Sequence, residues 1–268
     1  MNETLATTSR PPAHRREFVS WLGSLADLVF PPLCGLCQSR VDSREKGLCA
    51  SCLEGIDQAR KAPACPTCAA SIAAFQVTKG RCPSCRGRRL HVAGAVRAGE
   101  YSGDLGQIIR GYKYHGREEL EPVLTDWLLE AAAGAPWLER VEAVTCVPTH
   151  WTHRFRRPFY PPEVLAPAVA RRLRLPYVRI LRRVRGGPHQ IGLTATERAE
   201  NIRGAFSLRR GATLHAARIL VIDDVKTTGA TLEECGKVLR RAGAAEVYAG
   251  VIGKVRRPEL GAPSLQTI

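Results

Sequence analysis

The stretch with the clearest chemistry is residues 221–232, VIDDVKTTGATL, in which two carboxylates precede a turn of hydroxyl residues and glycine. Glycine lets the backbone approach a ligand closely, and successive N–H groups in such a turn can point at an anion. The turn is therefore predicted to bind a phosphate through Thr227, Thr228, Gly229, Ala230 and Thr231. Carboxylates accept hydrogen bonds from vicinal hydroxyls, so Asp223 and Asp224 are predicted to bind a ribose. Together they indicate a ribose 5-phosphate ligand.

The elements around this turn are predicted to place it at the edge of a sheet. Residues 217–222, ARILVI, are typical of a strand buried on both faces, and ligands bind at the carboxyl ends of such strands. A helix is expected directly afterwards, with Thr231 and Glu234 spaced as a capping box. An ordinary strand-to-helix loop and a metal-binding acidic pair are the alternatives, and the combined pattern disfavours both.

The same stretch resembles the signature of type I phosphoribosyltransferases, in which apolar residues precede Asp-Asp and then TTGxT. The resemblance implies that the ligand is PRPP with Mg2+, that Asp223 and Asp224 contact its ribose, and that residues 227–231 contact its 5-phosphate. It also implies a pyrophosphate-binding segment after a predicted strand at 141–147, with Thr149, His150 and Arg154 as candidates. The alternative is that these residues belong to a general basic surface.

The cysteines form a second chemical pattern. Two thiolates in one turn can converge on a tetrahedral ion, and a second pair completes the site. Eight of the ten cysteines lie in four CxxC pairs: Cys34 and Cys37, Cys49 and Cys52, Cys65 and Cys68, Cys82 and Cys85. Sequential pairing predicts two structural Zn2+ sites, and an interleaved pairing stays open. Disulfides are disfavoured because no secretory signal is evident, and iron–sulfur ligation lacks the usual closely spaced third cysteine.

The chain of 268 residues is expected to hold a cysteine-rich head and a larger domain. We predict an N-terminal tail and amphipathic helix over 1–30, a double zinc ribbon over 31–90 and a phosphoribosyltransferase-like domain over 91–268. The last is expected to be an α/β fold with a mostly parallel, Rossmann-like sheet and flanking helices. No apolar run approaches the ~20 residues that span a membrane, so a cytoplasmic protein is expected.

The charge is strongly positive and concentrated. The formal net charge is +15, and residues 154–185 contain ten arginines opposed only by Glu163. Such a field attracts polyanions, including nucleic acid, although charge alone reads no base sequence. A solvated basic surface is the alternative.

A glycine-rich segment at 185–206 precedes the strand of the phosphate turn, where type I enzymes carry a flexible loop that closes over PRPP. Its residues Gln190, Leu193, Arg198 and Asn201, followed by Gly-Ala-Phe, match a narrower pattern. That pattern resembles the ComF family of competence proteins, which also share a KYH-G-R helix end, a Val-Pro strand end and the VIDDV.TTGATL signature. One departure is that Pro-Phe-Tyr-Pro follows Arg157 here, where many members have Gly-Phe-Asn-Gln.

The resemblance implies a PRPP-binding protein that acts in DNA uptake and natural transformation, with single-stranded DNA and uptake or helicase proteins as partners. It favours a phosphoribosyltransferase, with turnover and acceptor open. One alternative is a salvage or amidotransfer enzyme that hands phosphoribose to a base or ammonia and releases pyrophosphate. The other is a non-catalytic zinc-ribbon DNA adaptor. The oligomeric state is not predicted.

Overall fold

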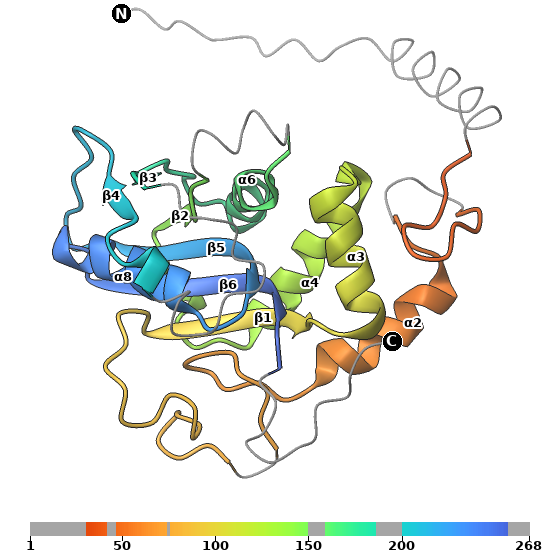
Figure 1. Cartoon of the computed structure of the whole chain (residues 1–268), viewed down its shortest axis with the longest axis horizontal. Helices are drawn as coiled ribbons and strands as arrows, with labels where there is room; N and C mark the ends of the chain where they lie inside the picture. Colours follow the sequence, from red (N-terminus) through yellow and green to blue (C-terminus); the bar gives the residue numbers. More distant parts are fainter. Residues whose placement is uncertain (1–30, 42–46, 74–75, 150–158, 186–199, 257–268) are drawn as a thin grey trace, which may run out of the picture.

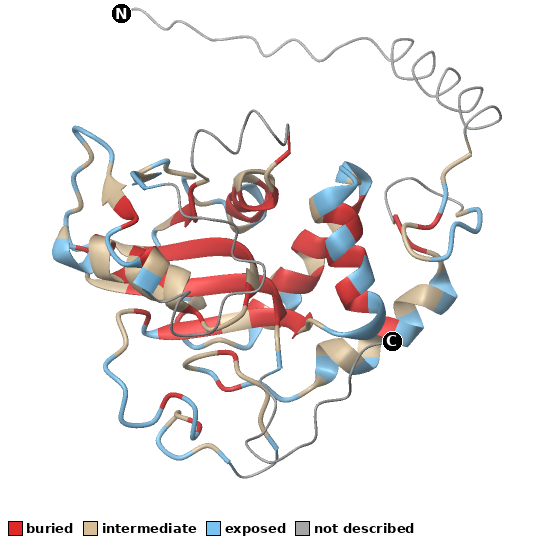
Figure 2. Ribbon diagram, viewed as in Figure 1, coloured by how far each residue is buried: buried red, intermediate tan, exposed pale blue. Residues whose placement is uncertain are grey.

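The centre of the molecule is a parallel sheet in the order β1-β6-β5-β2 (Figure 1). The computed structural model describes residues 31–41, 47–73, 76–149, 159–185 and 200–256. The strands are β1 Gly94–Glu100, β2 Ala143–Cys146, β5 Arg218–Lys226 and β6 Glu246–Lys254. β5 and β6 are buried along almost their whole length, which explains their continuous apolar runs (Figure 2). The predicted α/β fold with a mostly parallel sheet is confirmed.

Helices cover both faces of this sheet. One face packs against α3 Gly103–Tyr114, α4 Glu121–Ala133 and α6 Pro161–Leu173, and the other against α8 Ala230–Arg241. An antiparallel hairpin of β3 Leu181–Arg183 and β4 Phe206–Leu208 lies on the α8 side, and short 3-10 turns occupy Glu118–Leu120 and Leu138–Arg140. Side chains alternate along β5: Leu220 and Ile222 join the first core cluster, and Ile219 and Val221 join the second.

Two predictions about the ends of these elements were wrong. β5 continues to Lys226, so the two aspartates lie within the strand and not after it. α8 begins at Ala230 with Gly229 as its N-cap, and Glu234 caps nothing, because its Oε1 accepts a hydrogen bond from the Gly204 N–H at 3.0 Å. A single parallel bridge, from Tyr177 to Val144, precedes β3.

The cysteine-rich head contains a helix that the sequence analysis did not predict, α2 Ala50–Lys61, between its two halves. The first half lies beyond α3 and joins the main apolar core through Cys34, Leu48 and Ile56 (Figure 1). The second half runs beside β1 and forms a small cluster of its own around Cys65, Cys82 and Cys85. The amphipathic helix predicted before residue 30 lies outside the described residues. Within the described ranges, no helix has the length and apolar character needed to cross a membrane.

Candidate functional site

The predicted phosphate turn connects β5 to α8. Gly229 adopts a φ of +87°, and a Cβ on it would lie 2.5 Å from Cε of Lys226, so both conformation and space require glycine there. Thr228 Oγ1 accepts a hydrogen bond from the Ala230 N–H at 3.3 Å. Thr231 follows in the first turn of α8, whose N-terminal N–H groups and dipole favour an anion. The turn therefore has the local structure of an anion site.

The carboxylate pair lies just before this turn and is almost completely buried. Asp223 and Asp224 are 7% and 6% exposed. Asp223 Oδ1 accepts the N–H of Asp224 at 2.9 Å, and Asp224 Oδ1 accepts the N–H of Val225 at 2.7 Å. Lys113, in the last turn of α3, places Nζ 2.6 Å from Asp224 Oδ2. Two buried acids thus share one close ammonium group.

The electrostatics of this pair follow from burial and mutual repulsion. Burial first, and the charge of Asp224 second, raise the pKa of Asp223 well above its ordinary value. Burial alone would lower the pKa of Lys113, but the carboxylates of Asp224 and Asp223 outweigh it, so its pKa is raised. Burial and the same two carboxylates raise the pKa of Tyr160. The site therefore favours ligand groups that donate hydrogen bonds or bring positive charge.

Lys113 is a candidate site residue that the sequence analysis missed, and Tyr160 is a second group whose pKa the carboxylates affect. Lys113 belongs to the KYH helix end, one of the motifs shared with the ComF family, to which the sequence assigns no contact with a ligand. Tyr160 lies in the departing Pro-Phe-Tyr-Pro segment, where its neighbour Phe159 meets Tyr112 edge-on with ring centroids 4.8 Å apart. The KYH pattern could have identified the lysine, whereas nothing in the sequence pointed to the tyrosine.

The candidate pyrophosphate segment begins where β2 ends. β2 and β5 are parallel neighbours with Cys146 opposite Ile222, so Thr149 follows the same edge of the sheet as the carboxylate pair. Thr149 also lines a cavity of ≈ 200 Å³ with four arginines, Arg179, Arg182, Arg183 and Arg209. His150 and Arg154 lie outside the described residues.

Of the glycine-rich segment 185–206, the candidate flexible loop, the structure describes residue 185 and residues 200–206. Asn201 is half-buried shortly before β4, and the buried Ala205 and Phe206 pack in the cluster that contains α8. Gln190, Leu193 and Arg198 lie outside the described residues, so their placement over a ligand stays a prediction.

The eight cysteines of the CxxC pairs gather into two tetrads, and in each the four sulfur atoms lie within 4.8 Å of one another. The first tetrad contains Cys34, Cys37, Cys49 and Cys52, and the second contains Cys65, Cys68, Cys82 and Cys85. Close Sγ···Sγ distances of 3.6 Å for Cys37 and Cys49 and 3.8 Å for Cys65 and Cys85 approach the ~3.8 Å edge of a tetrahedron with Zn–S bonds of about 2.3 Å. The donor sets therefore fit two structural Zn2+ ions, with sequential pairing.

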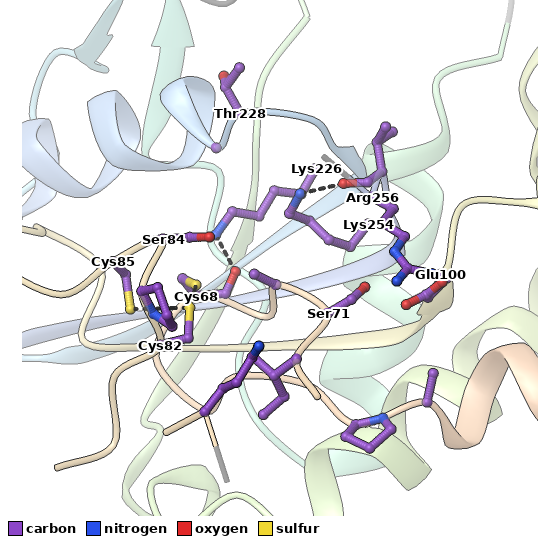
Figure 3. A pocket seen from close by; sticks show the side chains of 18 of the residues that line it. Cys68, Ser71, Cys82, Ser84, Cys85, Glu100, Lys226, Thr228, Lys254 and Arg256 are labelled. Atoms are coloured by element: carbon purple, nitrogen blue, oxygen red, sulfur yellow. Dashed lines mark hydrogen bonds between the residues drawn. The ribbon is translucent and has the colours of Figure 1, made fainter. Parts of the chain in front are cut away.

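Both tetrads are attached to the α/β domain by cations. Arg117, just after α3, donates from Nη1 to the carbonyl of Gly35 at 2.7 Å in the first tetrad. Lys226, the last residue of β5, donates from Nζ to the carbonyl of Cys68 at 2.8 Å in the second tetrad (Figure 3). The lysine of the VIDDVKTTGATL stretch thus belongs to the ribbon interface.

Comparisons with known proteins agree with this organisation. Residues 25–86 match the double zinc ribbon domain, and residues 163–261 match the phosphoribosyl transferase domain. The chain is 28% identical over 219 residues to competence protein F of Haemophilus influenzae, covering 80% of this chain and 93% of that protein. It is also 28% identical over 227 residues to the DNA utilization protein YhgH of Salmonella typhimurium, covering 82% and 96%.

A solved structure described as the allosteric regulatory enzyme of purine biosynthesis has 25% identity and covers 48% of this chain. This chain spans only 24% of that protein, and at a TM-score of 0.33 the likeness carries no weight. The domain matches and the curated relatives define the class: a double zinc ribbon joined to a phosphoribosyltransferase-type α/β domain. Within that class the chain is similar over most of its length to competence protein F and to YhgH, in line with the resemblance to ComF proteins noted in the sequence.

Proposed function

We propose that this protein binds PRPP with Mg2+ and acts in DNA uptake, as a ComF-type protein. The observation that carries the proposal is the junction of a buried carboxylate pair with an anion-binding turn at the end of β5. Asp223 and Asp224 accept the ribose hydroxyls, and Thr227, Thr228, Gly229, Ala230 and Thr231 hold the 5-phosphate.

The remaining parts of PRPP would be held along the same sheet edge. Thr149 would bind the pyrophosphate together with His150 and Arg154, and Mg2+ bound with PRPP would offset part of the charge on its phosphates. Lys113 places its ammonium group 2.6 Å from Asp224 Oδ2, beside the ribose. Any transfer then depends on positioning and on stabilising the charge that develops as pyrophosphate leaves, so no nucleophilic side chain is required.

The DNA role rests on the relatives' names and on the basic surface. Competence protein F and the DNA utilization protein share most of their length with this chain. Arg182 and Arg209, on and beside the β3–β4 hairpin, are exposed near the cavity that Thr149 lines. Phosphates of single-stranded DNA would bind there, with an affinity that falls steeply with salt because counterions are released.

Titration calorimetry with PRPP and Mg2+ tests the site. The double variant Asp223→Ala/Asp224→Ala should lose binding, whereas Asp126→Ala/Glu130→Ala should retain it. This control removes two carboxylates of α4 whose side chains are 46% and 63% exposed and which pair with Arg172 and Arg60. Unchanged affinity in the first variant would refute the assignment. Pyrophosphate release measured with bases, ammonia and single-stranded DNA as acceptors then separates a transferase from an adaptor, which should release none.

A further inference from the structure

Lys226 connects the second tetrad directly to the phosphate turn. Its Nζ donates to the carbonyl of Cys68, a residue 158 positions away and within one of the metal-binding CxxC turns. Its aliphatic chain lies directly beneath Gly229, where an added Cβ would be 2.5 Å from Cε and 3.3 Å from Nζ. The same side chain therefore touches the ribbon at its tip and the turn along its stem.

A second lysine completes this support from the neighbouring strand. Lys254, at the end of β6, donates from Nζ to the carbonyl of Thr227 at 2.9 Å, and Val255 donates its N–H to the carbonyl of Lys226 at 3.0 Å. Lys226 and Lys254 are only 8% and 5% exposed. In Figure 3 they lie between Thr228 on one side and Cys68 and Cys82 on the other. Two buried cations thus underlie the turn.

The ribbon side of this contact is itself anchored. Arg97 of β1, 4% exposed, donates to the carbonyl of Ala69 at 3.2 Å and to Ser71 Oγ at 2.6 Å. The N–H of Ala95 bonds to the carbonyl of Pro66 at 3.1 Å. These bonds fix the position of the Cys68 carbonyl relative to β1. They can form only while the ribbon half that holds the second tetrad is folded.

The ribbon and the turn also share one cavity, of ≈ 620 Å³. Its lining includes Cys68, Cys82 and Cys85 of the ribbon and Lys226, Thr228 and Gly229 of the turn. Figure 3 shows the three cysteines on the opposite side of Lys226 from Thr228. Because the space is open, the turn rests on the ribbon through a few specific bonds and not on a continuous packed layer. Loss of one such bond should therefore alter the conformation of the turn.

We propose that Lys226 is a positioning residue through which metal binding at the second tetrad holds the turn in its phosphate-binding conformation. Four thiolates outweigh the charge of one divalent ion, so the loaded tetrad also attracts the ammonium group. The inference rests on the proposed binding of PRPP. By thermodynamic linkage, PRPP binding must in turn stabilise metal binding at the second tetrad by the same factor.

The test compares full-length variants. Lys226→Met keeps the stem and removes the ammonium group, and Lys237→Met makes the same change on α8, where the lysine lies 3.4 Å from Glu234 and touches no ribbon residue among its described contacts. Cys85→Ser removes the second metal and Cys37→Ser the first. Each variant is assayed for PRPP affinity by calorimetry, zinc content by elemental analysis and folding by circular dichroism.

We expect Lys226→Met to retain zinc and to lose at least about fivefold in PRPP affinity, the lower end of ordinary coupling between sites. Cys85→Ser should lose a similar factor, and the double variant should lose no more than either single one. Lys237→Met should bind as the parent protein, and Cys37→Ser should lose less than Cys85→Ser. A zinc-loaded Lys226→Met with parental affinity, or additive losses in the double variant, would overturn the coupling.

A measurement on the Cys37→Ser protein needs no change at Lys226, in case Lys226→Met does not fold. The zinc affinity of the remaining tetrad, measured at equilibrium against a competing zinc-selective chelator, should rise at least about fivefold at saturating PRPP, as linkage requires. An unchanged zinc affinity, with PRPP bound, overturns the coupling alone. A parent protein that binds no PRPP refutes the proposed function, and the coupling with it.

Discussion

The two cysteine tetrads have the same ligands but different surroundings. The first shares the main apolar core, where Cys34, Leu48 and Ile56 pack in one cluster with Leu120. A Cβ on Gly35 would lie 2.7 Å from Leu120, which shows how closely this turn approaches the α/β domain. The second tetrad has a small cluster of its own and reaches the domain through buried cations and through one small side chain, Ala69, which packs in the second core cluster.

This difference separates two uses of a metal site. Where the turn packs into an apolar core, metal binding and the stability of the whole chain are expected to be coupled. Where the turn is held by a few directed hydrogen bonds, metal binding should affect the atoms that share those bonds, which here include the phosphate turn. The first tetrad would then serve stability, and the second would serve the site.

Removal of the metals should have the largest effect on the stability of the protein. Structural zinc contributes about 10–16 kcal/mol in small metal-dependent domains, so Cys34→Ser and Cys65→Ser should each abolish the order of their own ribbon half. Cys34→Ser should also lower the melting temperature of the α/β domain, because Cys34 is fully buried in its core. Thermal unfolding and hydrogen exchange measure both effects. Equal losses in the α/β domain would break the comparison, and a zinc-free folded protein would refute both metal sites.

Truncation of a packing leucine tests the apolar side of the contrast. Leu120→Ala removes a fully buried side chain beside the first tetrad and should cost about 2–5 kcal/mol of unfolding free energy. Leu90→Ala is the matched change beside the second tetrad, where Leu90 is only half-buried, and should cost about 1 kcal/mol or less. Urea denaturation measures both values. A larger cost for Leu90→Ala would show that the cluster around the second tetrad contributes more to the free energy of unfolding than the packing around the first.

Removal of the arginine anchors tests the polar side. Arg97→Met leaves the Ala69 carbonyl and Ser71 without their donor in a buried interface and should cost about 1–3 kcal/mol. Arg117→Met removes one bond, to the carbonyl of Gly35, from a half-buried position and should cost about 1 kcal/mol. Only Arg97→Met should speed zinc loss from the second tetrad. Faster loss in both variants would mean that the tetrads are anchored alike.

The sequence predicted the parallel sheet, the helices that flank it and the tetrads, though not α2, because the signals of these features are local or periodic. Apolar runs identify buried strands, and a CxxC turn brings its own two thiols together. The pairing between CxxC turns was left open, since it depends on contacts across 12 to 20 residues. Glu234 shows the limit of local patterns: its spacing from Thr231 suggested a cap, yet its partner is Gly204 in another segment.

The sequence predicted only those residues of the candidate site that lie in one continuous stretch. Asp223, Asp224 and the turn lie together in the sequence, so their types sufficed. Lys226 lies in the same stretch, but its partner Cys68 is 158 residues away, and no pattern indicates such a bond. Lys113 is likewise brought to Asp224 by the packing of α3 on the sheet. Long-range contacts of single polar side chains carry no periodic signal.

The last prediction concerns the pH dependence of stability and of ligand affinity at the carboxylate pair. The end of α3 carries Lys113 beside Asp224 and leads to Arg117 at the first tetrad. Because burial and Asp224 raise the pKa of Asp223, this carboxyl keeps its proton to a higher pH in the folded protein. Stability should therefore fall as the pH rises through the raised pKa, since the folded state must give up a proton that the unfolded chain has already lost.

Ligand affinity should change in the opposite direction. A ribose hydroxyl donates to an ionised carboxylate, so PRPP binding should tighten as the pH rises through the same pKa, by at most about tenfold per pH unit for one proton. Asp223→Asn removes this component and leaves only the titration of the ligand itself. Lys113→Met removes a positive charge from both carboxylates, so the rise should move to higher pH. Calorimetry over a pH series checks both shifts. If the profile of Lys113→Met matched that of the parent protein, the end of α3 would not tune the carboxylates, and the first tetrad would have no electrostatic route to the site.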